Sequence, residues 1–484
     1  MKILMATSEF SPLASTGDLG DQVRILTTEL KRLNHDVGVV MPLYRSVRES
    51  NLKLSTSNID FQVSLGGKRV SADVVETTTP EGIQVYLIRR DEYFDRSGIY
   101  GAHGRAYEDN AERFIFFARA VLELAGRVAS GPELIHCHDW PTALVPVFVK
   151  DRQLPFQTVL TVHDLEYQGS FWSFDFALTS LPGSYFGPGG VEFYGRLNFL
   201  KGGILHADAV TLPGEVALFE AFSSQHGYGM DGVLQENRFH LFGIPHGVDY
   251  SRTSPPYSEL FAESLKPGFA NGKTGCRRAL LEQLELVKDP KGIVINLPVE
   301  SHDGVAFNYA KPILDLVLTA DTCLIVTGTG ADLDVTDMII AERKYPARLA
   351  YRPEADTKLR QAALAGSDVV LLPSSLGLYG VNALAAMRYG TVPIVKSKGG
   401  VHQLLSDYDS AASSGCGFIY NSNTPLALWD AIRRANDLYH RPDEWNLLAE
   451  RAKSADFSWV ETAKAFAMLY ANLLRHRPAR TIAT

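Results

Sequence analysis

The order of hydrophobic and polar residues predicts alternating strands and helices along most of the chain. Lys2 to Thr7 is a short apolar run, and Leu19, Val23, Leu26, Leu30 and Leu33 then recur at three- and four-residue steps. Val37 to Met41 is a second apolar run. This strand, helix, strand order is typical of a parallel sheet that is covered by helices. Further buried strands are expected at Leu134 to Cys137, Thr158 to Val162 and Ala209 to Leu212.

Two other segments of the first half have a different pattern. Residues 60–90 alternate apolar and polar positions, which predicts a small β-meander inserted in the first domain. Glu108 to Ala125 has the spacing of an amphipathic helix. Ser184 to Gly203 is rich in glycine and aromatic residues, and we expect a helix at Val191 to Lys201 that presents Tyr194 and Asn198 on one face.

A second alternating pattern begins at Gly292. Residues 251–290 contain Pro255, Pro256 and Pro267 in a polar mixture, which favours a linker. The last helix, Trp459 to Leu474, has an apolar face that needs a partner, and we expect it to cross back onto the first domain. The remaining predicted strands are Ile293 to Ile295, Thr322 to Thr327, Arg348 to Tyr351, Asp368 to Leu372 and Val392 to Val395, and the remaining predicted helices are Thr424 to Tyr439 and Pro442 to Ser454.

These elements predict an α/β protein with two Rossmann-like, doubly wound parallel sheets and a cleft between them. The expected boundaries are 1–250 for the first domain, 251–290 for the linker, 291–455 for the second domain and 456–484 for the returning helix. A length of 484 residues is enough for two domains that each bury a core.

Candidate chemistry lies where the strands end, because ligands of parallel sheets bind at the carboxyl ends of strands. The loop from Ser15 to Gly20 contains Gly17 and opens a helix, so its backbone N–H groups are suited to an anion. Ser374 to Tyr379 and Lys396 to Gly400 follow two strands of the second domain. The sequence His136-Cys137-His138-Asp139-Trp140 ends one strand and His163-Asp164 ends another. His136, His138 and Asp139 could hold a metal, but alternating residues at a strand end are more often one packed and one exposed side chain, so we expect no metal.

Composition narrows the function. The net charge is −8 with both signs interspersed, and no basic cluster alternates with aromatics, so nucleic acid is not an expected partner. No apolar run is long enough for a signal peptide or a membrane span. The four cysteines are far apart, which fits a reducing compartment. We therefore expect a cytoplasmic protein that uses neither a membrane nor a cofactor.

Several long, collinear motifs identify a family. They are KILMATSEFSP, IHCHDWPTALVPVFVK, TVLTVHDLEYQGSF, SYFGPGGVEFYGRLNFLKGGILHAD, GYGMDGVL, LAGSDVVLLPSS and RYGTVPIV. From Met1 to about Arg475 the chain resembles bacterial glycogen synthases and plant starch synthases. The resemblance implies the two-domain GT-B fold and transfer of glucose from ADP-glucose to the non-reducing end of an α-1,4-glucan or maltooligosaccharide.

The resemblance fails at the positions that meet the donor. The family's Lys-Thr-Gly-Gly-Leu is Ser15-Thr16-Gly17-Asp18-Leu19 here, and its Asn-Gly-Ile-Asp begins with His246. Pro298 and Asp303 stand where the family has the Arg and Lys that clamp the diphosphate. Gly377 replaces the catalytic Glu. The replacements at positions 15, 18, 298 and 303 together remove about five units of positive charge, each worth roughly 3 kcal/mol to a nearby anion.

Other family positions are retained. The resemblance implies that His163 and Asp139 act on the transferred sugar, and that Asn198, Gly399 and Gly400 contribute to substrate binding. These residues would also persist if they only held the sheet edge in place. Aromatic side chains near them, such as Trp140 and Tyr194, suit a sugar.

Three interpretations therefore stay open. The first is a catalytically impaired synthase homologue that binds glucan or a protein partner. The second is an active glycosyltransferase with a changed donor or a rebuilt site, to which Glu300 and His302 could contribute and in which ADP-glucose remains a substrate. The third is a purely structural role in an assembly.

Overall fold

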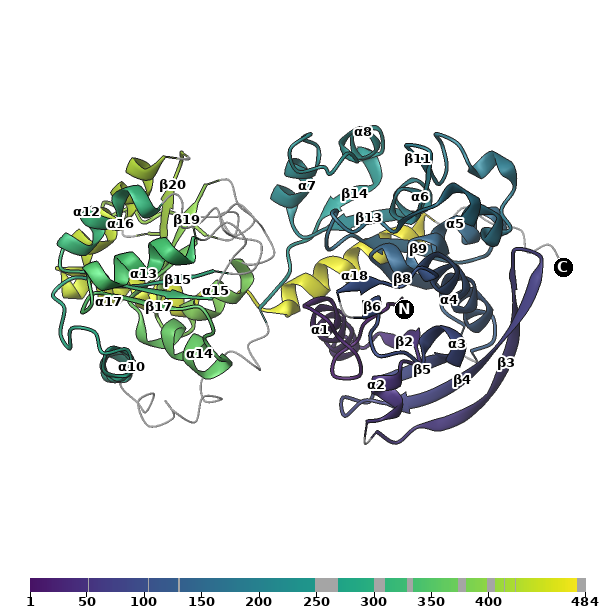
Figure 1. Cartoon of the computed structure of the whole chain (residues 1–484), viewed down its shortest axis with the longest axis horizontal. Helices are drawn as coiled ribbons and strands as arrows, with labels where there is room; N and C mark the ends of the chain where they lie inside the picture. The colour runs from purple at the N-terminus through teal and green to yellow at the C-terminus, as the bar shows by residue number, and fades with distance from the viewer. Residues whose placement is uncertain are drawn as a thin grey trace. The chain divides into compact units, whose positions relative to one another are not determined.

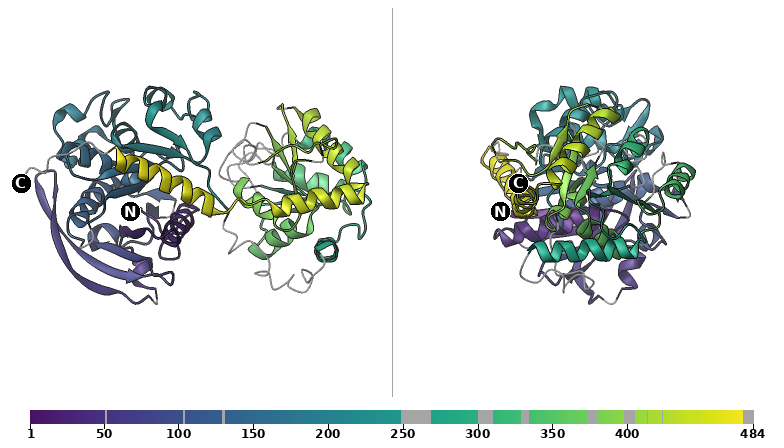
Figure 2. Two further views of the ribbon diagram at one scale, coloured as in Figure 1. Left: turned by 180° about the vertical axis from the view of Figure 1, so that it is seen from behind. Right: turned by 90° about the vertical axis from the view of Figure 1, so that its left-hand side faces the viewer.

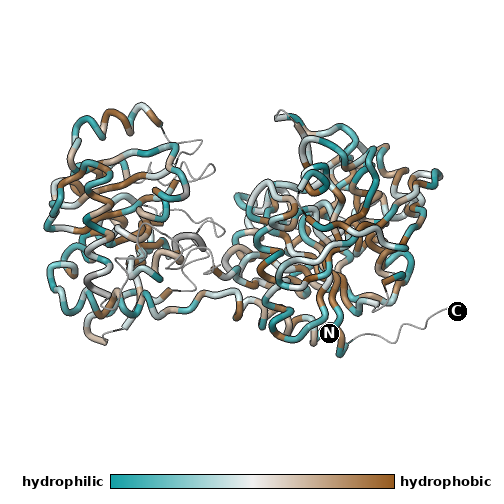
Figure 3. Tube along the Cα trace, turned by 90° about the horizontal axis from the view of Figure 1, so that it is seen from below, coloured by the Kyte–Doolittle hydropathy of each residue, from teal (hydrophilic) through white to brown (hydrophobic). Residues whose placement is uncertain are grey.

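The computed structural model describes residues 1–50, 52–102, 104–128, 131–248, 269–299, 310–328, 334–372, 380–397, 405–412, 414–422 and 424–476. The chain forms two compact units. Unit 1 comprises Met1–Pro245 and Trp459–Thr484, and unit 2 comprises His246–Ser458. Each unit has its own sheet and its own hydrophobic core, and Figure 3 shows the apolar segments inside each of them.

Unit 1 is built on a nine-stranded sheet in the order β14-β13-β9-β8-β1-β2-β5-β4-β3 (Figure 1). The strands from β14 to β5 are parallel, and β4 and β3 continue the sheet in antiparallel fashion. Residues 60–90 therefore lie in an antiparallel meander of β3, β4 and β5, as expected, and this meander extends one edge of the main sheet. The strands are β1 (Lys2–Ala6), β2 (Asp36–Pro42), β3 (Ser55–Leu65), β4 (Lys68–Thr78), β5 (Gln84–Arg89), β8 (Leu134–His138), β9 (Gln157–Thr161), β13 (Ala209–Leu212) and β14 (Leu241–Gly243).

Helices cover both faces of this sheet. The helix α18 (Trp459–Arg475) packs beside α1 (Leu19–Arg32) on one face, and α4 (Asn110–Ala125), α5 (Leu144–Asp151) and α6 (Phe199–His206) lie on the other (Figures 1 and 2). The smaller elements of unit 1 are α2 (Arg45–Arg48), α3 (Asp91–Phe94), β6 (Gly101–Ala102), β7 (Arg105–Ala106), η1 (Trp140–Thr142), β10 (Ser170–Phe171), η2 (Ser173–Thr179), η3 (Gly183–Tyr185), β11 (Glu192–Phe193), β12 (Arg196–Asn198), α7 (Glu215–Ala221), α8 (Asp231–Glu236) and η4 (Arg238–His240).

The last helix returns to unit 1 from unit 2. Its Trp459, Ala463, Phe466 and Tyr470 side chains are buried in the core of unit 1. The Tyr470 hydroxyl is 2.7 Å from Nδ1 of His136, which lies on the central strand β8. The helix therefore finds the apolar partner that its spacing requires.

The prediction of a helix at Val191 to Lys201 is wrong. The chain forms an antiparallel hairpin, β11 and β12, whose turn contains Tyr194 with φ of 49° and Gly195 with φ of 76°. The side chain of Asn198 accepts a hydrogen bond from the backbone N–H of Lys201, and this cap starts helix α6 one residue later. Gly195 permits this turn, and its presence indicates a hairpin more strongly than the spacing of Tyr194 and Asn198 indicates a helix.

Unit 2 contains a six-stranded, wholly parallel sheet in the order β17-β16-β15-β18-β19-β20. Its strands are β15 (Val294–Pro298), β16 (Cys323–Thr327), β17 (Leu349–Arg352), β18 (Val369–Leu372), β19 (Val392–Lys396) and β20 (Phe418–Tyr420). Its helices are α10 (Phe269–Gln283), η5 (Lys311–Ile313), α12 (Leu314–Thr319), α13 (Val335–Lys344), α14 (Thr357–Gly366), α15 (Gly380–Met387), α16 (Pro425–Tyr439) and α17 (Pro442–Ser454).

Helix α10 corrects the expected linker at 251–290. Its Cys276, Leu280 and Leu281 side chains are buried among residues of the second sheet, and Arg277 Nε is 3.0 Å from the Asp368 carboxylate. Apolar residues at positions 280, 281 and 284 have the spacing of a helix face, but the neighbouring prolines outweighed them. Residues 269–290 thus belong to the folded second unit.

We predict that Tyr470→Phe destabilises the protein, because His136 then loses a buried hydrogen bond to the last helix. The loss should lower the free energy of unfolding of unit 1 by about 1–2 kcal/mol, which a urea titration followed by tryptophan fluorescence would measure. Met468→Ala is the matched control, since this side chain of the same helix is 68% exposed. Equal stability of Tyr470→Phe and the wild type would contradict this role of the hydroxyl.

Candidate active site

Two neighbouring parallel strands deliver the predicted sugar-side residues to one edge of the first sheet. β8 pairs with β9, and His138 lies opposite Thr161 in this register. Nδ1 of His138 is 3.1 Å from Nε2 of His163, and the imidazole rings are stacked with centroids 5.4 Å apart. The backbone N–H of His163 donates a 2.7 Å hydrogen bond to Oδ1 of Asp139. The structure therefore brings His163 and Asp139 together, with His138 as a third member.

Asp139 has an unusual backbone and an unusual acidity. Its φ of 56° lies in the left-handed region, where a non-glycine residue costs energy and often marks a functional position. Burial raises the pKa of its carboxyl group to about 8, against the hydrogen bond from His163, which lowers it. A carboxyl group that holds its proton near neutral pH is suited to proton transfer or to donating a hydrogen bond to a sugar hydroxyl.

His136 lies on the inner side of the same strand. Its Nε2 is 2.6 Å from the Thr161 hydroxyl, which is itself 2.6 Å from the Thr211 hydroxyl, and its Nδ1 meets Tyr470. Burial moves the pKa of His136 well below its ordinary value, so the ring is neutral. One ring nitrogen thus ties β8 to the neighbouring strand β9, and the other ties it to the last helix. Among the residues that the structure describes, no group of three or more His, Cys, Asp or Glu side chains is arranged to hold a metal ion.

The loop after β1 places hydroxyl and carboxyl groups where the family resemblance expects a lysine and a glycine. Ser15 is exposed, and its hydroxyl donates to the backbone oxygen of Gly17 at 2.6 Å. Both the backbone N–H and the hydroxyl of Thr16 donate to the Glu9 carboxyl group, at 2.6 and 2.8 Å. The pKa of the Asp18 carboxyl group is raised, first because the group loses hydration and second because of the negative charge of Asp21. The loop is therefore ordered by its own polar groups and contributes no cation from positions 15 to 18.

Glu9 is a residue that sequence reasoning missed. It is buried just after β1, and it accepts a further 2.8 Å hydrogen bond from the Tyr100 hydroxyl, which also meets Ser8. Its position after the first strand, next to a predicted anion-binding loop, was the available signal. The carboxyl group of Glu9 adds a further acidic residue to this edge of the sheet.

Asn198 and Tyr194 do not share one face. Asn198 is fully buried, its Oδ1 caps helix α6, and its amide donates to Oε1 of Gln168 at 2.9 Å. Tyr194 is 83% exposed in the hairpin turn. Asn198 therefore positions Gln168 and the helix start, while Tyr194 is free to meet a ligand from solvent.

Two of the altered donor positions are described in unit 2. Pro298 ends β15 opposite Thr327 and is half-buried, so the position supplies neither a charge nor an N–H group. His246 is buried, and burial lowers its pKa to about 4, which keeps the ring neutral. Asp303, Gly377, Gly399 and Gly400 lie outside the described residues.

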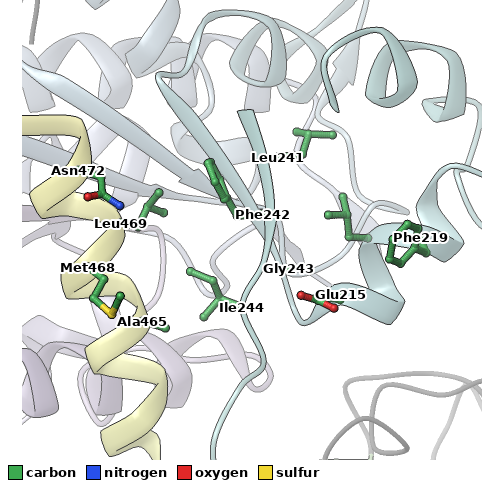
Figure 4. Close-up of a pocket in the computed structure, with 11 residues that line it drawn as sticks. Glu215, Phe219, Leu241, Phe242, Gly243, Ile244, Ala465, Met468, Leu469 and Asn472 are labelled. Atoms are coloured by element: carbon green, nitrogen blue, oxygen red, sulfur yellow. The ribbon is translucent and has the colours of Figure 1, made fainter. Parts of the chain in front are cut away.

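A pocket of about 500 Å³ lies elsewhere in unit 1, between α7, β14 and α18 (Figure 4). Its walls are mainly apolar, and none of the predicted site residues lines it. Its apolar side chains include Phe219, Phe242, Ile244 and Met468, and Glu215 and Asn472 are the polar residues that line it. The pocket has the size of a small-molecule site but lacks the chemistry of the sheet edge. Among the helices that the structure describes, none has the length and apolar content to cross a membrane.

Two Rossmann-like units with a helix that returns to the first one define the class of GT-B glycosyltransferases. The catalytic domain of starch synthase IV from Arabidopsis thaliana, solved bound to ADP and acarbose, superposes with a TM-score of 0.81 over 98% of this chain and 99% of that one, at 24% identity. A sucrose-phosphate synthase from Thermosynechococcus elongatus shares the fold more distantly, with a TM-score of 0.55, 17% identity and coverage of 98% of this chain and 99% of that one.

Sequence comparison gives the family. The starch synthase catalytic domain matches residues 2–236, and glycosyl transferases group 1 matches residues 310–452. The glycogen synthase of Syntrophotalea carbinolica is 33% identical over 97% of this chain and 98% of its own length. The glycogen synthase of Moorella thermoacetica is 33% identical over 99% of this chain and 98% of its own length. The chain belongs to the glycogen and starch synthase family, and it is a glycosyltransferase of the glycogen synthase type.

We predict that Asp139→Asn changes the pH dependence of stability. A carboxyl group whose pKa is raised on folding binds its proton more tightly in the native chain, so its contribution to stability falls as pH rises from about 4 towards about 8. Asparagine does not titrate, but its Oδ1 can still accept the His163 N–H. The melting temperature of the variant, relative to the wild type, should therefore rise between about pH 5 and about pH 8.5.

The control for this measurement is Glu166→Gln, which removes an exposed carboxylate from the next loop. Its melting temperature relative to the wild type should stay nearly constant over the same range. A parallel pH profile for Asp139→Asn and the wild type would contradict the raised pKa.

Proposed function

We propose that the protein is a glycogen synthase homologue that binds α-1,4-glucan and is strongly impaired in glucose transfer from ADP-glucose. The observation that supports this most directly is the loop after β1. Ser15 and Asp18 stand where the family resemblance implies contact with the donor, and the loop is held by the hydrogen bonds of Thr16 to Glu9. An acidic loop repels a diphosphate and therefore binds it weakly.

The physical reason is charge. Transfer from a nucleotide sugar leaves a diphosphate with about two negative charges, and the barrier falls when fixed cations meet that charge as it develops. Pro298 and Asp303 replace the expected Arg and Lys, and Gly377 replaces the expected Glu. These three replacements and the loop act on the same step, so restoring one of the positions leaves the others missing.

Glucan binding relies on other groups, and these remain. Asp139 and His163 lie side by side at the sheet edge. Trp140 and Tyr167 are close to them in sequence, and Tyr167 and Tyr194 are exposed aromatic side chains of the same unit. Neutral hydrogen bonds and aromatic contacts need no diphosphate clamp. The family resemblance also implies that Gly399 and Gly400 contribute to substrate binding.

An active enzyme with a rebuilt site is the second candidate. The observation in its favour is identity of 33% over nearly the whole length with proteins named glycogen synthase. Such an enzyme would need a carboxylate and cations from other positions, for which Glu300, His302, Lys396 and Lys398 are the sequence candidates. The protein partner and the cytoplasmic location expected from the sequence stay predictions.

We predict that maltohexaose binds and that ADP does not. Calorimetric titration of the full chain should give weak maltohexaose binding that salt between about 0.05 and 0.5 M leaves unchanged, because sugar contacts are not screened. Trp140→Ala should weaken this binding, whereas Phe239→Ala, an exposed aromatic elsewhere in unit 1, should not. Salt-sensitive ADP binding at micromolar concentration would reverse the proposal.

We predict further that ADP-glucose turnover is absent and that Gly377→Glu alone does not restore it. A carboxylate placed near Asp18 and Asp303 adds negative charge to a site that already repels the donor. The measurement is incorporation of labelled glucose into glycogen, with a no-enzyme control. Transfer well above that control by the unmodified protein would favour the rebuilt site.

A matched pair of combined variants separates donor binding from chemistry. The first carries Ser15→Lys, Asp18→Gly, Pro298→Arg and Asp303→Lys, and it should recover ADP binding without turnover. The second adds Gly377→Glu and is the one with a physical case for activity. Turnover by the first variant would show that Gly377 is not the missing catalytic position.

A further inference from the structure

The short strand β14 ends the nine-stranded sheet of unit 1, and the pocket of Figure 4 lies beside it. Among the strands that the structure describes, none pairs with the outer side of β14. Phe219 of α7 and Met468 of α18 are each 68% exposed in this pocket, and Phe242 of the strand itself is 39% exposed. Unpaired strands and exposed apolar side chains are both features of binding surfaces. We call the outer side of β14 with Phe219, Phe242 and Met468 the β14 surface.

The other end of the sheet is protected against pairing in a way that β14 is not. The last strand there, β3, is 11 residues long, but its pairing with β4 is irregular between Thr56 and Asp60, and Asp60 is exposed. Bulges and charged side chains are usual means of preventing an outer strand from pairing with another chain. β14 has the sequence Leu-Phe-Gly, with no charged residue, and it pairs in regular register with β13. The β14 end of the sheet is therefore the one available for pairing.

The hydrogen bonds of β14 show which of its backbone groups face outward. The N–H of Ile244 donates to β13 at 3.0 Å, and alternate residues of a parallel strand face the same neighbour. Phe242 therefore faces β13 as well, and the backbone groups of Leu241 and Gly243 face outward. The N–H of Leu241 donates to Arg238 in the preceding turn. The C=O of Leu241 and the N–H of Gly243 are thus directed at the position of a further strand.

A second copy of this chain has the groups that fit this position. When two β14 strands run antiparallel around a two-fold axis at Phe242, Leu241 of one copy lies opposite Gly243 of the other. The N–H of each Gly243 then meets the C=O of the opposite Leu241. The two Phe242 residues are directly opposed, with Cβ atoms about 5 Å apart. Since Phe242 and Met468 line the same pocket, each copy covers apolar side chains of the other.

The charges at the two ends of β14 favour the antiparallel arrangement. Arg238 is exposed just before the strand, and its guanidinium lies over the Phe239 ring at 4.6 Å. Glu215 is exposed at the other end, where a Cβ at Gly243 would lie 2.4 Å from the Glu215 Cα. Antiparallel pairing brings the Arg238 end of each strand to the Glu215 end of the other, so opposite charges meet twice. Parallel pairing would place like charges together.

We propose that the β14 surface is an interface between two copies of this chain, in which the β14 strands pair antiparallel about a two-fold axis at Phe242. The two sheets then continue into one another, and the Phe219 and Met468 side chains lose their exposure to water. The strand is short, so most of the contact comes from side chains. The interface is accordingly small, and we expect a reversible dimer rather than a permanent one.

The first test measures the association of the full chain by sedimentation equilibrium over a range of concentrations. Phe242→Lys places two like charges opposite each other at the axis and should raise the dissociation constant of the dimer by about ten-fold or more. Phe174→Lys is the matched control, because Phe174 is an exposed aromatic residue of η2 in the same unit. It should leave the dissociation constant unchanged. Thermal melting should show that both variants are folded.

The second test examines the antiparallel arrangement. Glu215→Arg and Arg238→Glu should each weaken the dimer, and the variant that carries both changes should restore it, because opposite charges meet again. Phe242→Cys should give a disulfide-linked dimer on oxidation with diamide. The wild type, whose four cysteines are buried or half-buried, and Phe174→Cys should not.

Three results would overturn the inference. A wild type that is monomeric at every concentration excludes a second copy and leaves the β14 surface to a different protein. A dimer that Phe242→Lys leaves intact uses another surface. Weakening by both single charge changes without restoration in the combined variant excludes the antiparallel arrangement. None of these results bears on glucan binding, so the proposed function is tested separately.

Discussion

The parallel pairing of β1, β8 and β9 is the constraint on which the candidate site depends. Because parallel strands end at the same edge of a sheet, the loop with Glu9 and the strand ends with Asp139 and His163 all emerge on one side. The buried contacts of His136 with Thr161 and Tyr470 fix the middle strand to its neighbour and to the last helix. The geometry of the site is thus set from within the core.

The sequence predicts the main sheets well, because buried parallel strands leave a clear signal. Ala209–Leu212 and Pro442–Ser454 are found at the expected residues. Apart from Val191 to Lys201, the other strands and helices whose bounds were predicted differ from expectation by a few residues at their ends. Both errors occur where glycine or proline lies close to a run with helical spacing. At Tyr194 a glycine-containing turn outweighs helical spacing, and at Leu280 a buried helix lies beside a proline-rich segment that resembles a linker.

The site was harder to predict than the fold, since a side chain's partners depend on distant parts of the chain. Glu9 and Tyr100 are 91 residues apart in the chain, and no local sequence pattern predicts their hydrogen bond. Asn198 could be found by its motif. Only the structure shows that its amide nitrogen donates to Gln168 and that its side-chain oxygen caps α6. The raised pKa of Asp139 likewise follows from burial and not from its neighbours in sequence.

The retained positions of unit 1 and the two altered positions of the loop after β1 differ in their physical surroundings. His136, His138 and Asn198 are buried and hydrogen-bonded within the core of unit 1, so replacing them would leave unsatisfied polar groups and destabilise the fold. Ser15 and Asp18 lie on an exposed loop, where a change of charge costs the fold little. Loss of selection for donor binding would therefore alter the loop first and leave the buried residues in place. Retention of a buried motif is accordingly weak support for activity, and the exposed residues of the loop after β1 give the better guide to what the protein binds.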